Sequence, residues 1–381
     1  MAVSSGITSF RKSRMKSNEI PGTKPSLYNN QLLISTGIPS LDLVIGGGIA
    51  VGTVMLVEED LFATYANLVV NYFVSEGIVC EQSVLAASLD LDMKQLTQEL
   101  PAPISDEPQL TTSQPDSDSM KIAWRYEAQP KVQSSAANTR FGHYYDLTKT
   151  MDGSQVESAD ITTIGEEELD TQAPRQNQLM KSKYCELLRH IKLKLDTGQF
   201  STACKSDKRN ILRIVLRSLG SPLWGECGVA SPQDQYDPSL LKFLLVLRSL
   251  LRSAYATCLI TMPSHLFQDP AFIERVEKMC DTVIQLESFA GSDREKNPAF
   301  KEYSGLLHIR QLPRLNSLVS HMPDTLDLAY KLRRKKFTVE KLHLPPELSE
   351  SASRSQEDVF IQNKSSNRSS CSSSGTSKFD F

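Results

Sequence analysis

The sequence feature that most restricts the fold is a short apolar run between a glycine-rich turn and a segment of helical periodicity. Residues 53–58 (TVMLVE) follow residues 46–52, which contain four glycines, and residues 62–76 repeat apolar side chains at helical spacing. A run of this length with such flanks is typical of a buried strand that leads into a helix. Because similar runs alternate with helical segments further along, the sequence predicts βαβ units and a mostly parallel sheet.

The remaining expected elements continue this alternation. Strands are expected over residues 83–90, 211–216, 257–262, 282–287 and 306–312, and helices over residues 181–196, 238–254 and 270–280. Gly77 is interpreted as a left-handed cap that ends the helix over residues 62–76. The last strands have no helix between them, so we expect them to form an antiparallel C-terminal extension. The predicted fold class is α/β, with a mostly parallel sheet flanked by helices.

Three segments are expected to be largely disordered, and the folded domain is expected to span residues 31–348. Residues 1–30 are rich in Ser, Lys and Arg, and residues 349–381 are dominated by serine, so both termini are predicted to be disordered. Residues 100–180 contain runs rich in Pro, Ser and Asp and are predicted to be a long, largely disordered insertion. Its middle, residues 121–147, carries aromatic side chains that are expected to anchor it on the core.

The residues that follow the first strand exclude an ordinary nucleotide phosphate loop. Such a loop has the pattern G-x-x-x-x-G-K-[ST], in which backbone N–H groups and the lysine hold phosphates and the hydroxyl holds Mg²⁺. The two glycines, the lysine and the hydroxyl residue are replaced here, in that order, by Glu58, Ala63, Thr64 and Tyr65. In addition, Glu58, Glu59 and Asp60 would repel a polyphosphate by about 1–4 kcal/mol per charge pair.

The strand over residues 211–216 gives an independent test of this prediction. Nucleotide-hydrolysing proteins place an aspartate after such a strand to organise Mg²⁺, whereas this strand is followed by Arg217. Asp90 and Asp92 could be proposed as water-activating carboxylates, but a solvated loop is the simpler interpretation. We therefore predict no catalytic residues, and an ATPase with a divergent nucleotide pocket remains the alternative.

Composition bounds the other function classes. The 42 basic and 45 acidic residues give a formal net charge of -3, which excludes the strong field of a nucleic-acid coat protein. The 7 cysteines are scattered without a CxxC pair and the 6 histidines have no ligand spacing, so neither a metal nor a cofactor is predicted. We find no apolar stretch long enough for a bilayer and no apolar signal region, so we expect an intracellular protein without membrane association.

Several co-linear motifs resemble those of one known family. The run STGIPSLDLVIGGG at residues 35–48 resembles the approach to the phosphate loop in RecA-like ATPases. Together with KIAWRY at 121–126, LRSLGSPLW at 216–224 and LDLAYKLRRKKFTVEKLHLPPE at 326–347, it resembles the PAXNEB-type family, the fourth subunit of the Elongator complex. The resemblance covers most of residues 31–347 and does not extend into the acidic insertion or the serine-rich tail.

The resemblance implies a RecA-like fold without functional nucleotide motifs and a non-catalytic accessory role. Members of the family form a hetero-hexameric ring with the fifth and sixth Elongator subunits, in two copies each, which binds tRNA and docks on the catalytic Elongator subcomplex. That complex modifies the wobble uridine of tRNA to 5-carboxymethyluridine and its 5-methoxycarbonylmethyl and 5-carbamoylmethyl derivatives. Elongator is also linked to transcription by RNA polymerase II, so the resemblance implies a location in the cytoplasm and also in the nucleus.

Two basic clusters are candidates for RNA contact. Arg333, Arg334, Lys335 and Lys336 belong to the denser one, and such a run can bind a phosphate backbone without sequence choice. The alternative interpretation is a solvated face or a contact with an acidic partner. The weaker candidate is the expected basic helix, with Lys181, Lys183, Arg189, Lys192 and Lys194.

Further hypotheses concern packing and assembly. Trp124 and Trp224 are expected to be buried anchors or subunit contacts rather than groups that stack on bases. A helical stripe is expected to face the core, and it consists of Leu241, Leu244, Leu245, Arg248 and Leu251. The three carboxylates at residues 58–60 have a second possible role, which is to accept an arginine from a neighbouring subunit.

Overall fold

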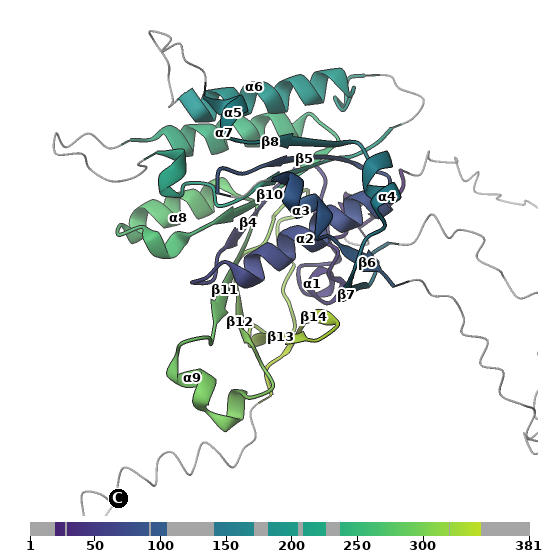
Figure 1. The fold of residues 1–381 in the computed structure, drawn as a ribbon. Coiled ribbons are helices and arrows are strands. Elements are labelled where there is room, and N and C mark those ends of the chain that lie inside the picture. The colour runs from purple at the N-terminus through teal and green to yellow at the C-terminus, as the bar shows by residue number, and fades with distance from the viewer. Residues whose placement is uncertain are drawn as a thin grey trace, which may run out of the picture.

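A nine-stranded sheet forms the framework of the molecule (Figure 1). The computed structural model describes residues 20–26, 29–90, 93–104, 141–170, 182–204, 209–225, 237–319 and 321–343. The sheet has the strand order β14-β13-β12-β11-β4-β10-β9-β5-β8. Its parallel strands are β4 (Val54–Glu58), β5 (Ser83–Ala87), β8 (Ile161–Ile164), β9 (Leu212–Leu216), β10 (Ala256–Met262) and β11 (Thr282–Ser288).

Three antiparallel strands extend this sheet beyond β11. They are β12 (Gly305–Gln311), β13 (Leu328–Arg333) and β14 (Lys336–Lys341). The predicted RecA-like α/β class, with a mostly parallel sheet and an antiparallel C-terminal extension, is thereby confirmed. The strand pair β13–β14 was not resolved by the sequence pattern, because charged residues interrupt its apolar alternation.

β4 lies in the middle of the sheet between β10 and β11. It leads into residues 58–65, where the glycines, lysine and hydroxyl residue of the phosphate-loop pattern are replaced, and this segment is named the degenerate loop. All five residues of β4 are buried. A strand with neighbours on both sides and helices on both faces has an unbroken apolar sequence, which explains why this run stands out. Because β4, β9 and β10 are parallel, their carboxyl ends meet at one edge of the sheet, and the loop after β4 opens there.

Helices cover both faces of the sheet (Figure 1). α2 (Thr64–Val79) contributes Phe73 to the apolar core on one face. The other face is covered by α6 (Ser182–Thr197), α7 (Ser239–Arg252) and α8 (Pro270–Met279). None of the helices in the described part of the chain is both long and apolar enough to cross a membrane.

The packing of the second face tests two predictions. Trp224 is 1% exposed and stacks on Tyr184 with ring centroids 5.7 Å apart, so it is a buried anchor as expected; Trp124 lies outside the described residues. In the predicted stripe of α7, Leu244 and Leu251 are buried. Leu245 is 59% exposed because it projects to the solvent side of the helix, so its inclusion in the core-facing stripe is wrong.

The interpretation of Gly77 as a left-handed cap is wrong. α2 continues through Gly77 to Val79, and Cys80 is its C-cap. A Cβ atom on Gly77 would lie 2.8 Å from Cδ of Arg213 and 3.0 Å from Cγ2 of Val84. Glycine is therefore needed here for the close approach of the helix to the sheet, not for its backbone freedom.

Two segments that were predicted to be disordered contain paired strands. β1 (Thr23–Pro25) pairs with β2 (Leu32–Ile34), which also pairs with β3 (Ile49–Ala50), so the prediction is wrong for this part of residues 1–30. β8 pairs with β5 as an edge of the main sheet, although it lies within residues 100–180. The sequence concealed β8 because it has only four residues between polar runs, so the prediction of disorder is also wrong for residues 148–170. Residues 141–147 belong to the expected anchor.

Short elements complete the described structure. In the insertion, β6 (Pro101–Pro103) pairs with β7 (Tyr145–Thr150), whereas residues 121–126 of the predicted aromatic anchor lie outside the described residues. The remaining helices are α1 (Pro39–Val44), α3 (Met93–Gln98), α4 (Gly153–Ser158), α5 (Glu166–Leu169) and α9 (Asp293–Lys296). The single 3-10 turns are η1 (Pro222–Trp224), η2 (Ser264–Leu266) and η3 (Pro298–Phe300).

Candidate functional site

The residues of the degenerate loop lie together at the carboxyl edge of the sheet. Glu58 is the last residue of β4, Ala63 has a left-handed φ of 54° just before α2, and Thr64 and Tyr65 are the first residues of that helix. Arg217 follows β9 directly at the same edge. The structure therefore brings the five predicted positions into one site, and their contacts define what the site can do.

Asp60 occupies the N-terminal end of α2. Its Oδ2 accepts a hydrogen bond from the Thr64 N–H at 3.0 Å, and its Oδ1 accepts from the N–H groups of Tyr65 at 3.0 Å and Ala66 at 3.1 Å. The first N–H groups of a helix have no acceptor within the helix, and together with the helix dipole they form an ordinary anion site. The side chain of Asp60 is 2% exposed, so this anion site is filled by a carboxylate of the protein itself.

Glu59 points in a different direction and binds hydroxyl groups. Its Oε1 accepts from Oγ1 of Thr261 at 2.6 Å and lies 3.0 Å from Oγ of Ser218. Burial raises the pKa of Glu59, although these two hydroxyls oppose the shift. Glu59 thus joins the loop to the ends of β9 and β10 and is not available to a ligand phosphate.

Arg217 lies beside the loop at the same edge of the sheet and is held in place. Its Nε donates to Oδ1 of Asn67 on α2 at 2.8 Å, and its guanidinium lies 3.8 Å from Oδ2 of Asp90. Asp90, considered above as a water-activating carboxylate, also accepts from Ser88 at 2.5 Å. These contacts make Asp90 part of a hydrogen-bonded network, whereas Asp92 lies outside the described residues.

Glu58 is separated from the other two loop carboxylates. Its side chain is 3% exposed and lies beside Ser264 and Glu277. Burial, reinforced by Glu277, raises the pKa of Glu58 to about 7. The sequence suggested that the three carboxylates at residues 58–60 act as one group, but the structure directs them to three different places.

The denser basic cluster lies at the tip of the β13–β14 hairpin. Arg333 and Lys336 are paired across the hairpin, and Arg334 and Lys335 form its turn. All four side chains are exposed. By contrast, Lys331 in the same sequence run is buried and lies 2.9 Å from Glu340, so it belongs to the fold.

The basic helix α6 is a weaker candidate for RNA contact in the structure as well. Three of its cations already have carboxylate partners. These are Lys183 with Glu166 at 3.3 Å, Arg189 with Glu186 at 2.6 Å and Lys194 with Asp160 at 2.7 Å. Lys192 is exposed, and Lys181 lies outside the described residues.

A buried ionic network anchors the insertion on α2. Glu76 accepts hydrogen bonds from the Tyr145 hydroxyl at 2.7 Å and from the His143 backbone N–H at 3.1 Å. Burial opposes ionisation of Glu76, but His143 and the nearby Arg213 outweigh it and lower the pKa to about 2. Glu76 and Arg213 were not identified from the sequence as functional or structural groups. Each is a single charged residue in an otherwise apolar stretch, and this pattern could have indicated a buried ion pair.

Three members of this region are close enough to bind a metal ion. Single ligand atoms of Glu76, Cys80 and His143 lie within 4.8 Å of one another. However, the fully buried Arg213 already supplies the positive charge, and burial raises the pKa of Cys80 to about 12, which keeps its thiol protonated. Because a thiol must ionise to bind a metal, we interpret these residues as a structural network.

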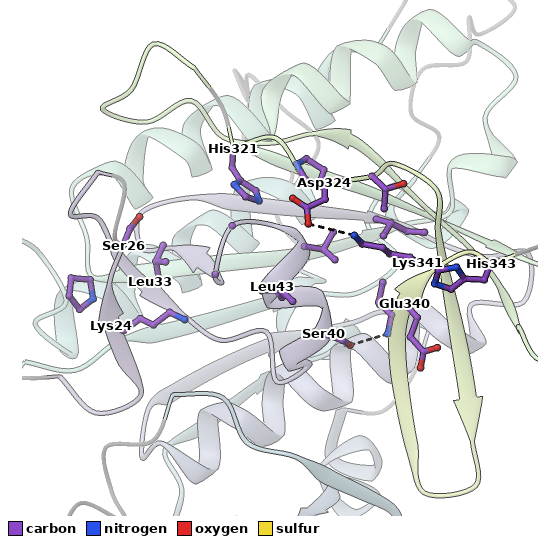
Figure 2. A pocket seen from close by; sticks show the side chains of 18 residues that line it. Lys24, Ser26, Leu33, Ser40, Leu43, His321, Asp324, Glu340, Lys341 and His343 are labelled. Atoms are coloured by element: carbon purple, nitrogen blue, oxygen red, sulfur yellow. Dashed lines mark hydrogen bonds and ion pairs between the residues drawn. The ribbon is translucent and has the colours of Figure 1, made fainter. Parts of the chain in front are cut away.

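A cavity of about 870 Å³ lies between the three-stranded sheet β1-β2-β3, α1 and the β13–β14 hairpin (Figure 2). Asp324 and Lys341 line this cavity and form an ion pair, with Nζ of Lys341 3.5 Å from Oδ2 of Asp324. Oγ of Ser40 accepts a hydrogen bond from the Val339 N–H at 2.9 Å. No residue from 58 to 65 lines it. The cavity is therefore separate from the degenerate loop.

The comparisons with known proteins agree with the sequence motifs. The family model described as PAXNEB protein matches residues 16–381. The chain belongs to the PAXNEB family. A curated PAXNEB relative in Danio rerio, named Elongator complex protein 4, is 46% identical over 369 residues and aligns over 93% of both chains. The protein of the same name in Homo sapiens is 43% identical over 376 residues, with 93% of this chain and 89% of the relative covered.

Similarity to solved structures is more distant. The crystal structure of the KaiC-like protein PH0186 from Pyrococcus horikoshii is 14% identical, with a TM-score of 0.43. The match covers 81% of this chain and 98% of that chain. The assignment to the PAXNEB family therefore depends on the sequence relatives and on the family model.

Proposed function

We propose that this chain is a non-catalytic accessory subunit of the Elongator complex. Relatives that align over nearly the whole chain carry the name Elongator complex protein 4. The observation that supports the non-catalytic part is Asp60, whose carboxylate accepts the N–H groups of Thr64, Tyr65 and Ala66. A phosphate group would need the same N–H groups at this helix N-terminus.

A nucleotide would bind here only at considerable cost. It would have to displace the Asp60 carboxylate, which would then remain close to the phosphates together with Glu59. Each like-charge pair at about 4 Å costs about 1–4 kcal/mol. Arg217 would have to leave Asn67 and Asp90 to compensate. The alternative function, an ATPase with a divergent pocket, therefore requires a rearranged loop.

A nucleotide titration of the purified full chain separates these two functions. We expect isothermal titration calorimetry to detect no binding of Mg-ATP up to about 1 mM nucleotide, which corresponds to less than about 4 kcal/mol of binding free energy. Asp60→Ala serves as the matched variant, because it removes the carboxylate that occupies the helix N-terminus. Micromolar affinity of the wild-type chain on its own would favour the ATPase.

The proposal includes the assembly and the RNA partner. In it, the chain joins the fifth and sixth Elongator subunits in a hetero-hexameric ring that docks on the catalytic subcomplex and supports modification of the tRNA wobble uridine. Its proposed locations are the cytoplasm and the nucleus, the latter with a link to RNA polymerase II transcription. Native mass spectrometry of the chain co-expressed with those two subunits tests the ring, and a chain that stays monomeric would contradict it.

The basic hairpin tip supports the tRNA part of the proposal. We expect replacement of its four exposed cations by alanine to weaken tRNA binding by the assembled ring and to lower the slope of log affinity against log salt by about 3–4. The replaced residues are Arg333, Arg334, Lys335 and Lys336. The control removes the same number of charges from α6, at Lys183, Arg189, Lys192 and Lys194. Equal losses in both variants would indicate a net-charge effect, and no loss in either would favour a pure assembly scaffold.

A further inference from the structure

A second cavity opens at the carboxyl ends of β4 and β11, next to the degenerate loop. It has a volume of about 530 Å³ and is bounded on one side by α8. Its lining is strongly acidic and contains Glu58, Glu59, Glu274, Glu277 and Glu287. The basic side chains in the lining are those of Arg310 and His265.

Two of the rim carboxylates already have cationic partners. Glu287 accepts from Arg294 at 2.7 Å and lies 2.8 Å from Nε2 of His308. Glu274 binds Lys278 at 2.6 Å, in an exposed pair one helical turn apart. Pairs of this kind are common on protein surfaces and contribute little energy. The rim by itself would therefore be an ordinary acidic surface.

Glu58 differs from the rim carboxylates. It is 3% exposed, it lines the cavity, and its Oε1 has no hydrogen-bond partner. Its carboxyl group is hydrogen-bonded to Ser264 and to a second carboxyl group, that of Glu277, and it is attracted by Arg310. Buried polar atoms in native proteins are nearly always satisfied, and an isolated buried carboxylate is costly. The isolated chain thus leaves one oxygen of this carboxyl group, Oε1, without a hydrogen-bond donor at the wall of an open cavity.

The chemistry of this acceptor restricts the group that can satisfy it. A phosphate or a carboxylate would be repelled by Glu58 and Glu277. Among the described residues, the group with metal-binding geometry does not include Glu58. A guanidinium carries several N–H donors in a planar fork and can bind two carboxylates at once. An arginine side chain therefore fits the cavity best.

The surroundings indicate that this arginine belongs to a polypeptide. Leu61 lines the cavity and is 61% exposed, and its neighbour Phe62 is 64% exposed. Two large apolar side chains exposed beside a buried carboxylate with one unsatisfied oxygen are typical of a surface that another protein covers. We propose that the cavity beside Glu58 receives an arginine side chain from a partner polypeptide. This inference rests on the proposed function in one respect, namely that the partner is another Elongator subunit.

Proton release should accompany this contact. Burial and Glu277 hold the pKa of Glu58 at about 7 in the free chain, so its carboxyl is mostly protonated below neutral pH. An arginine binds the carboxylate, so the affinity should increase as the pH rises through about 7. The other titratable or charged groups that line the cavity are Glu59, Glu274, Glu277, Glu287, His265 and Arg310.

Assembly of the full chain with the fifth and sixth Elongator subunits tests the proposal. For the wild type we expect affinity to rise about tenfold between about pH 6 and about pH 8, as the carboxyl ionises. Glu58→Gln should weaken assembly at the higher pH by at least about tenfold and abolish the pH dependence. Glu274→Gln, the matched control from the same cavity, should change affinity by less than about twofold. Assembly of Glu58→Gln with wild-type affinity would overturn the proposal.

A second measurement keeps the cavity testable without the partner. N-acetyl-arginine amide should bind the isolated wild-type chain more tightly than N-acetyl-citrulline amide, its neutral analogue, and the difference should vanish in Glu58→Gln. Equal binding of the two amides to the wild type would overturn the proposal. If the wild type binds the arginine amide but assembles with neither Elongator subunit, the cavity assignment holds and the proposed function fails. Urea midpoints of both variants establish that they are folded.

Discussion

Removal of the Asp60 carboxylate should destabilise the start of α2. Asp60→Ala leaves the N–H groups of Thr64, Tyr65 and Ala66 without an acceptor and removes a negative charge from the positive end of the helix. Loss of an N-terminal cap costs about 0.5–2 kcal/mol, and a partly buried charge at a helix end contributes up to about 2 kcal/mol. Since the two effects overlap, we expect the free energy of unfolding to fall by about 2–3 kcal/mol.

Urea unfolding of the full chain, followed by far-UV circular dichroism, measures this effect. With a slope of about 3 kcal/mol/M, the midpoint should fall by about 0.7–1 M. Asp60→Asn keeps an oxygen for Tyr65 and Ala66 but loses the charge, so it should show about half of this shift. Thr64→Ala is the control, because the Thr64 side chain is exposed on the same turn and its loss should cost less than about 0.5 kcal/mol.

An Asp60→Ala midpoint within about 0.2 M of the wild type would contradict this role of the Asp60 carboxylate. That result would mean that water satisfies the three N–H groups as well as the carboxylate does. The helix N-terminus would then be free to accept another anion, and the argument against a phosphate at this position would lose its main support.

Three further predictions concern buried side chains and use the same unfolding assay. The pKa of Glu76 is lowered from 4.5 to about 2, so its contribution of about 3 kcal/mol is present above pH 4.5 and is lost as the pH falls through about 2. The stability of Glu76→Gln should accordingly depend less on pH than that of the wild type in this window, and parallel pH profiles would contradict the assignment. Gly77→Ala should destabilise by about 1–2 kcal/mol because its Cβ would approach Arg213, despite the better helix propensity of alanine, and a stabilised variant would exclude the steric explanation. Trp224→Ala should cost about 3–5 kcal/mol, since the indole is fully buried against Tyr184; a loss below about 1 kcal/mol would show that it is no anchor.

The central strands and the long helices could be predicted from the sequence, because burial of a strand or helix requires apolar residues in a continuous run or at regular spacing. β4 and β9 are enclosed on both faces, so β4 is apolar up to its last residue, Glu58, and Arg213 is the one charged residue in β9. The apolar residues at helical spacing over residues 62–76 correspond to most of α2. β8 could not be predicted in the same way, since an edge strand of four residues leaves too short a pattern. Gly77 was misread because sequence alone does not distinguish a glycine needed for space from one needed for backbone freedom.

The candidate site was predicted in its position but not in its contacts. The sequence located Glu58, Glu59 and Asp60 in one loop and suggested a shared electrostatic role. Which carboxylate binds the helix, which binds hydroxyls and which keeps one unsatisfied oxygen depends on β9, β10 and α8, and these elements are more than a hundred residues away in the chain. Such separation is the general reason why side-chain partners are harder to predict than strands.

The pairing of β6 with β7 has a consequence for chain length. Pro103 lies opposite Tyr145 in this pair, so the two ends of the connection between these strands are held at neighbouring points of the fold. Each doubling of a closed segment adds only about 0.6 kcal/mol of closure entropy. A change in the number of residues between these two ends therefore changes the closure entropy only slightly, because the β6–β7 pair fixes the distance that the connection must span.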